Sequence, residues 1–214
     1  MYTTRKSLLK RMQKCDEISW EEFYRIYWPL VDAVGRKIGL SPDQNKDLMQ
    51  EIMLDLFKKE LLLRYDASRG KFRTFFGVLI RHKASEMLHN STRLSVVANV
   101  GGSESGDVPA SSSAHMSEII EDGNDPFQKI FNEEYRNFLL SVAMNELRNS
   151  VEPKTYAIFE MVVLQGRPAK EVARHLGISR AVIDVYCSRC RKTLRRIVSE
   201  IQTESPEFTL DIPL

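Results

Sequence analysis

Apolar residues recur at intervals of three and four along most of the chain, which is the spacing of one face of an α-helix. In chain order, the predicted helix starts are Ser19, Ser41, Phe72, Phe127, Glu152, Pro168 and Ser179. The pattern therefore predicts an all-α protein.

The helical pattern is interrupted between residues 91 and 126, where serine, glycine and acidic residues dominate and aromatic residues are almost absent. Such a composition cannot bury enough apolar surface to offset the entropy of ordering the chain. The interruption predicts a flexible acidic linker between two small helical domains, residues 1–90 and 127–201. Residues 202–214 are predicted to form a poorly ordered tail.

Two predicted helices begin with a capping box, a serine followed three residues later by glutamate or glutamine. These are Ser19–Glu22, with Ile18 and Phe23 placed as a hydrophobic staple, and Ser41–Gln44, with Pro42 at the first helical position. In the helix after Ser41, the residues predicted to face inward are Leu48, Ile52, Met53, Leu56 and Phe57. The opposite face, either a solvated surface or a docking surface, is predicted to carry Asp47, Gln50, Glu51, Leu54 and Asp55.

Residues 168–197 predict two helices joined by a tight turn. Gly177 can end the first helix and Ser179 can cap the second. The apolar stripe of the first helix is Ala169, Val172, Ala173 and Leu176. The buried stripe of the second helix is predicted to be Ile183, Cys187, Cys190, Leu194 and Ile197. This arrangement is typical of a helix-turn-helix, whose second helix can enter the major groove of DNA.

The distribution of charge supports a nucleic-acid partner more than the net charge of +2 does. Residues 1–93 hold 18 Lys and Arg against 12 Asp and Glu (+6), and residues 135–214 hold 12 against 9 (+3). The intervening residues 94–134 hold one against eight (−7). Within the helix-turn-helix the basic residues are Lys170, Arg174, Arg180, Arg189, Arg191, Lys192, Arg195 and Arg196. Such a surplus suits phosphate contacts, although a solvated basic face has the same pattern.

Several function classes are disfavoured by the sequence. No apolar run is long enough to span a bilayer and no signal peptide is recognisable, so we expect a cytoplasmic protein without membrane insertion. Cys187 and Cys190 lie on a buried stripe without a second ligand pair, which predicts packing rather than a metal site. No Walker lysine, HExxH or nucleophile-elbow motif occurs. We therefore expect a binding protein, not an enzyme, that needs no cofactor.

Basic and aromatic residues alternate between residues 64 and 83. The aromatic residues are Phe72, Phe75 and Phe76, at the start of the helix predicted from Phe72. The basic residues are Arg64, Arg69, Lys71 and Arg73 around a turn at 66–70, followed by Arg81, His82 and Lys83. Such interleaving suits a surface that stacks bases and follows a nucleic-acid backbone. Buried aromatic residues beside a solvated basic rim give the same pattern.

Four stretches together resemble a sigma factor of the sigma-70 family, of the extracytoplasmic-function type that has only conserved regions two and four. Two stretches resemble region two. They are Trp20-x-x-Phe23-x-x-x-Tyr27-x-Pro29-Leu30, and Gly39-Leu40 followed by Asp47-Leu48-Met49-Gln50-Glu51-Ile52. A third stretch resembles the promoter-melting segment of region two. It is Tyr65-Asp66-x-x-x-Gly70-x-Phe72-Arg73-Thr74-Phe75-Phe76, running to Arg81-His82-Lys83. The fourth stretch resembles region four. It is Ala169-x-Glu171-Val172-Ala173-x-x-Leu176-Gly177-Ile178-Ser179, with Ile183 and Arg189-x-Arg191-x-x-Leu194.

The resemblance implies that the chain binds core RNA polymerase and directs it to promoter DNA, with an anti-sigma factor as a further candidate partner. It places polymerase contacts on Asp47, Gln50, Glu51 and Leu54. It places minus-ten contacts on Arg64, Tyr65, Arg69, Lys71, Arg73, Arg81, His82 and Lys83, with the loop at 65–71 receiving a flipped base. In the recognition helix it directs Arg180, Asp184 and Ser188 to base edges, and Arg189, Lys192 and Arg195 to phosphates.

Some positions depart from the family pattern. Phe75 stands where the family most often has tryptophan, and His82 where it often has asparagine. Asp184 and Tyr186 replace the lysine and arginine common near the head of the recognition helix. An acid at this position weakens general phosphate affinity but can accept a hydrogen bond from a cytosine amine.

Two other classes of protein compete with this interpretation. One is a stand-alone helix-turn-helix regulator, in which residues 1–89 sense a signal or dimerise. The other is a DNA-processing enzyme such as a recombinase subunit, against which the absence of a catalytic constellation argues. A regulator is expected to bind duplex DNA specifically by itself, whereas a sigma factor is expected to need core polymerase.

Overall fold

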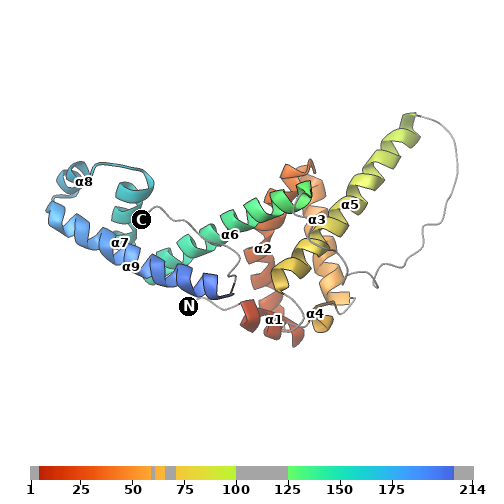
Figure 1. Cartoon of the computed structure of the whole chain (residues 1–214), viewed down its shortest axis with the longest axis horizontal. Coiled ribbons are helices and arrows are strands. Elements are labelled where there is room, and N and C mark those ends of the chain that lie inside the picture. The colour runs from red at the N-terminus through yellow and green to blue at the C-terminus, as the bar shows by residue number, and fades with distance from the viewer. Residues whose placement is uncertain (1–4, 59–60, 66–70, 100–124, 205–214) are drawn as a thin grey trace. The chain divides into compact units, whose positions relative to one another are not determined.

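The computed structural model describes residues 5–58, 61–65, 71–99 and 125–204 (Figure 1). The described residues form helices joined by short turns and contain no strand, which confirms the predicted all-α class. They divide into two compact units, the first ending at Glu134 and the second beginning at Tyr135. None of the described helices is long and apolar enough to cross a membrane.

The first unit is built from five helices and the start of a sixth. These are α1 (Arg5–Gln13), α2 (Glu17–Lys37), α3 (Pro42–Lys58), α4 (Leu61–Arg64), α5 (Phe72–Asn99) and the first turns of α6 (Pro126–Ser150). α3 packs against both α2 and α5, and α1 packs against α2 and α4 (Figure 1).

The core of the first unit is an aromatic cluster between α2 and α5. The rings of Phe23 and Tyr27 stack with centroids 4.5 Å apart, and Phe76 meets them edge-on at 5.7 and 5.1 Å. Phe72 stacks on Phe76 at 5.5 Å. All four side chains are buried. Aromatic pairs in these geometries contribute beyond the area that they bury, so the cluster fixes which face of α5 points inward.

The two predicted capping boxes have different outcomes. At α3, the side chain of Gln44 accepts from the backbone N–H of Ser41 at 2.8 Å, and the Ser41 hydroxyl accepts from the N–H of Gln44 at 3.2 Å, which confirms that box. The box at Ser19 is wrong, because α2 begins two residues earlier and the Ser19 hydroxyl donates to the Asp16 carbonyl at 2.5 Å. Ile18, the predicted staple, is 71% exposed.

The buried face of α3 is shifted from the predicted one. Met49 and Asp55 are buried although they were not assigned to the core, and Phe57, predicted to face inward, is 58% exposed. Phe57 instead meets the ring of Trp20 edge-on at 5.4 Å. Asp55 can be buried because Lys83 of α5 lies beside it, with its ammonium group 3.1 Å from the Asp55 carboxylate.

The predicted linker begins inside a helix. α5 continues to Asn99, nine residues past the expected end of the first domain, and residues 100–124 lie outside the described part of the chain. The boundary between the two compact units falls within α6, at Glu134 and Tyr135. The first turns of α6 belong to the first unit because Phe131 packs against α5 at Gly77, where an added Cβ would lie 2.9 Å from the ring.

The second unit comprises the rest of α6, three short elements and one long helix. These are α7 (Pro153–Phe159), one π-helical turn η1 (Glu160–Leu164), α8 (Ala169–Leu176) and α9 (Arg180–Glu204). Its core joins α7, α8 and α9 through Ile158, Val172, Ala173, Ile183 and Cys187. Gly166, with φ of 65°, allows the reversal between η1 and α8.

We expect Gly35→Ala to destabilise the chain by about 1–3 kcal/mol, the usual cost of overfilling a packed site. A Cβ at Gly35 would lie 1.9 Å from Oδ1 of Asn45. Asn45 is fully buried, and its Nδ2 donates to the carboxylate of Asp32 at 3.1 Å. Both tryptophans lie on α2, so urea denaturation followed by their fluorescence measures the effect.

The double variant Gly35→Ala/Asn45→Ala is the control, because it removes the side chain that the new methyl group meets. It is expected to be less destabilised than the sum of the two single variants. A Gly35→Ala variant as stable as the wild type would contradict close packing between α2 and α3.

Candidate nucleic-acid interface

A left-handed glycine makes the turn between α8 and α9. Gly177 has φ of 64° and ψ of 30°, and the N–H of Ile178 donates back to the carbonyl of Ala173 at 3.1 Å. α9 then begins with the Ser179 hydroxyl accepting from the N–H of Val182 at 3.4 Å. The predicted roles of Gly177 and Ser179 are thus confirmed, and the turn between the helices is three residues long.

The buried stripe of α9 is the predicted one. Each member is at most 3% exposed, and the members are Ile183, Cys187, Cys190, Leu194 and Ile197. On α8, Val172 and Ala173 are buried, whereas Leu176, also predicted to belong to the stripe, is 36% exposed because it ends the helix. A fixed inner face leaves the opposite side of α9 for solvent or a ligand.

The two cysteines of this stripe are packing residues in the structure. Burial raises the pKa of the Cys187 thiol. Burial, and to a smaller extent the nearby Cys187, raises the pKa of the Cys190 thiol to about 11. The Cys190 thiol also donates to the carbonyl of Thr155 at 3.8 Å. Neutral thiols are poor nucleophiles and metal ligands. Within the described residues, no cluster of His, Cys, Asp and Glu could hold a metal ion.

The outer face of α9 carries all six residues assigned to the recognition helix. Arg180, Asp184, Ser188, Arg189, Lys192 and Arg195 are exposed. Nε of Arg180 lies 3.9 Å from the carboxylate of Asp184, so these two charges offset each other at the head of the helix. The unopposed positive charge lies farther along, where Arg189, Lys192 and Arg195 follow one another at intervals of three.

The basic residues of α5 point in three directions, since consecutive helical residues are rotated by about 100°. Arg81 faces α6, with a guanidinium nitrogen 2.5 Å from the carboxylate of Asp125 and the group 5.9 Å from the ring centroid of Phe127. Two turns earlier, Arg73 lies over the ring of Phe131 at 5.7 Å and donates to the side chain of Asn132. These two arginines are therefore engaged within the chain.

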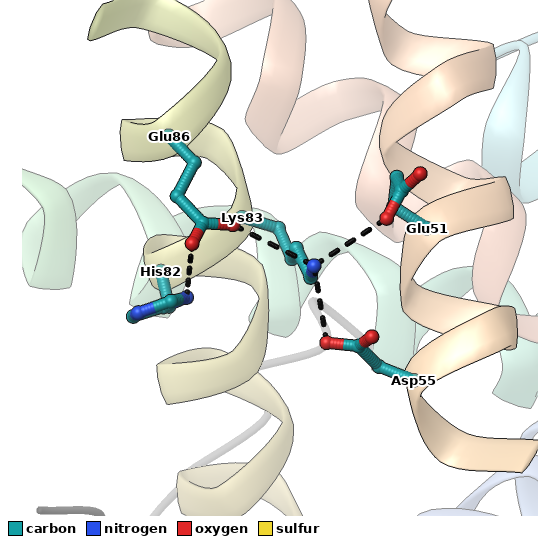
Figure 2. A network of polar contacts seen from close by, with 5 residues as sticks. All are labelled: Glu51, Asp55, His82, Lys83 and Glu86. Atoms are coloured by element: carbon teal, nitrogen blue, oxygen red, sulfur yellow. Dashed lines mark hydrogen bonds and ion pairs between the residues drawn. The ribbon is translucent and has the colours of Figure 1, made fainter. Parts of the chain in front are cut away.

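Lys83 points toward α3 and is nearly buried. Its ammonium group lies 3.1 Å from the carboxylate of Asp55 and 3.4 Å from that of Glu51, with Glu86 of α5 at 3.5 Å (Figure 2). Burial alone would lower the pKa of Lys83, but the hydrogen bond and charge of Asp55, with the two glutamates, raise it above its ordinary value. Lys83 thus holds α5 to α3 and is not presented to an external ligand.

A line of exposed side chains remains on the outer side of α5. Its members are Thr74, His82, Ser85 and His89, which recur at helical spacing. His82 lies 3.6 Å from the carboxylate of Glu86, a surface pair of low energy (Figure 2). Only His82 of the residues predicted on α5 lies on this line. The helical spacing of these residues in the sequence indicates such a line, whereas the adjacent charges at 81–83 do not, because neighbouring residues on a helix point in different directions.

The segment before α5 is partly described. Tyr65 is half-buried, with its ring 5.5 Å from that of Phe72 and 5.4 Å from that of Phe75, and Lys71 is exposed. Arg64 ends α4, and Arg69 lies outside the described residues together with the rest of the predicted turn at 66–70. Tyr65 therefore joins an aromatic platform at the start of α5.

The outer face of α3 is polar with an apolar edge. Asp47 and Gln50 are exposed, and Leu54 is 40% exposed on the same side. Phe57 continues this line three residues later. Glu51 is only half-exposed because it also contacts Lys83. The face thus combines a carboxylate, an amide and two large apolar side chains, a composition that suits a protein partner.

Replacing Lys83 by methionine should destabilise the chain by roughly 3 kcal/mol, because the carboxylate of Asp55 would stay buried without its cation. Lys46→Met is the matched control; it breaks an exposed pair with Asp43 and should leave the stability close to that of the wild type. Lys83→Met/Asp55→Leu should recover most of the loss. Urea denaturation measures all three, and equal stability of both single variants would contradict the assignment.

The stabilisation by Lys83 should also depend on pH. Because its pKa is raised in the folded chain, the stabilisation is complete below the unfolded-state value of about 10.4 and is lost as pH rises through the folded-state value. The difference in unfolding free energy between wild type and Lys83→Met should therefore be constant from neutral pH to about pH 10 and narrow above it. A difference that narrows between neutral pH and pH 10 would identify a different group.

Comparison with known proteins adds no family assignment to this geometry. No model of a known protein family matches the chain, and a search of curated proteins returned no match.

Proposed function

We propose that the chain is a sigma factor of the sigma-70 family, of the extracytoplasmic-function type, which binds core RNA polymerase and directs it to promoter DNA in the bacterial cytoplasm. One observation carries the proposal. A helix ends at a left-handed glycine, and the next helix turns a buried stripe inward and an exposed basic face outward. This is the geometry that a major-groove reader requires.

The roles on α9 follow from exposure and charge. Arg189, Lys192 and Arg195 are exposed and serve as phosphate contacts, which position the helix. Ser188 lies among them and is placed to meet a base edge. Arg180 and Asp184 offset each other in the free chain, so each contributes to recognition only where DNA separates the pair.

The first unit supplies the other two surfaces. We assign polymerase docking to the outer face of α3, at Asp47, Gln50 and Leu54, and extend it to Phe57. The minus-ten surface is revised, because Arg73, Arg81 and Lys83 are engaged within the chain. We assign it to the exposed line on α5 that includes His82, together with Lys71 and the aromatic platform at Tyr65.

The stand-alone regulator is separated from this proposal by dependence on polymerase. A sigma factor should show specific promoter binding only together with core polymerase, and a regulator should show it alone, as a dimer on paired half-sites. An electrophoretic mobility assay of the full chain on genomic promoter fragments, with and without core polymerase of the host bacterium, makes the distinction. Specific binding by the free chain, unchanged by polymerase, would overturn the proposal.

The docking surface can be tested by charge reversal. Asp47→Lys combined with Leu54→Asp should reduce co-purification of core polymerase at least tenfold, because it reverses the charge and removes an apolar side chain of the proposed docking face. Both side chains are exposed, so the fold should be kept. Glu51 is left unchanged, since its reversal would place a second cation beside Lys83.

Glu21→Lys is the control, an acid-to-lysine reversal like Asp47→Lys at an exposed position of α2. It should co-purify polymerase as the wild type does, and both variants should keep the wild-type unfolding midpoint. Undiminished co-purification by the α3 variant would remove this face from the docking surface.

Lys192→Ala and Arg195→Ala should each weaken holoenzyme–promoter binding equally across promoter sequences and lower the salt slope by about one. The slope is obtained from affinities measured at several salt concentrations. Lys154→Ala, an exposed lysine on α7, should leave the slope unchanged. A change in sequence preference would instead identify the altered residue as a base reader.

A further inference from the structure

The head of α9 carries apolar side chains on its exposed side. Val185 is 49% exposed and Val182 38% exposed, and Ala181 beside them is also exposed. Single exposed apolar residues are common on protein surfaces. Three within five positions, on a helix whose opposite face is an uninterrupted buried stripe, need a more specific explanation.

Val185 lies at the centre of the outer face. It stands two residues from both Ile183 and Cys187, which are buried, so it is rotated by about 200° from each of them. At helical spacing it is aligned with Ala181 on one side and with Ser188 on the other. The line continues to Lys192, and it is the line that would lie deepest in a groove.

The surrounding charges indicate the kind of partner. Arg189 and Arg195, like Lys192, are exposed around this line, whereas Asp184 at the head of the helix is offset by Arg180. Cations that flank a short apolar strip suit a polyanion with an apolar group between its charged edges. In the major groove of DNA that group is the C5-methyl of thymine, which apolar side chains contact.

We propose that Val185, with Val182 beside it, contacts thymine methyl groups in the major groove and so gives the upstream promoter element a requirement for A·T pairs. The inference rests on the proposed function, because it needs α9 to enter the groove. It adds a specificity determinant at a position that has neither a hydrogen-bond donor nor a charge on its side chain.

The test removes the methyl group alone. Deoxyuridine pairs as thymidine does but lacks the C5-methyl, so it is substituted for each thymidine of the upstream element in turn. Wild-type holoenzyme should lose about fourfold in affinity at one or two positions, the effect of one buried methyl group. Holoenzyme with Val185→Ala should bind the thymidine and deoxyuridine duplexes equally at the position that Val185 reads. Leu164→Ala truncates another exposed apolar residue of the second unit and should keep the wild-type discrimination.

The possible outcomes separate this inference from the function on which it rests. A wild-type holoenzyme that selects promoters but binds both duplexes equally at every position overturns the inference alone. Retained discrimination with Val185→Ala, or a Val185→Ala variant that loses polymerase instead, also overturns it and identifies another reader or a protein contact. Absence of any polymerase-dependent promoter binding by the wild type overturns the proposed function and the inference together.

Discussion

The aromatic contact between α2 and α5 is the constraint on which the first unit depends. Once Phe72 and Phe76 face Phe23 and Tyr27, the direction of every other side chain on α5 is determined by the helical rotation. Between residues 72 and 89, one flank then meets the first turns of α6 and the other meets α3, and the line of Thr74, His82, Ser85 and His89 is left exposed to solvent. The minus-ten and polymerase-docking surfaces that we propose are thus both set by packing within the first unit.

Lys83 and Asp55 show what this constraint does to charged residues. Their positions in the sequence suit solvent-exposed faces, yet packing places the two side chains opposite each other with little access to water. A buried pair of this kind contributes little net stability against an apolar alternative but penalises loss of either member heavily. It therefore specifies how α3 and α5 pair more than it strengthens their association.

The parts predicted correctly are those in which local sequence and tertiary packing agree. Short-range spacing, which can be read from the sequence, determines four of these parts. They are the all-α class, the capping box at Ser41, the left-handed turn at Gly177 and the buried stripe of α9. The directions of Arg73, Arg81 and Lys83 could not be predicted, because each is decided by a partner that lies distant in the sequence. The capping box predicted at Ser19 is wrong for a local reason, because α2 begins two residues before this serine.

The contrast between the three cysteines has a practical consequence. Cys187 and Cys190 are buried with raised thiol pKa values, whereas Cys15 is exposed. A maleimide dye at neutral pH will therefore attach to one defined point in the native chain, in the first unit, without mutagenesis. Slower incorporation of a second and third dye would then report local opening of the helix that carries Val185, at Cys187 and Cys190, in the otherwise folded protein.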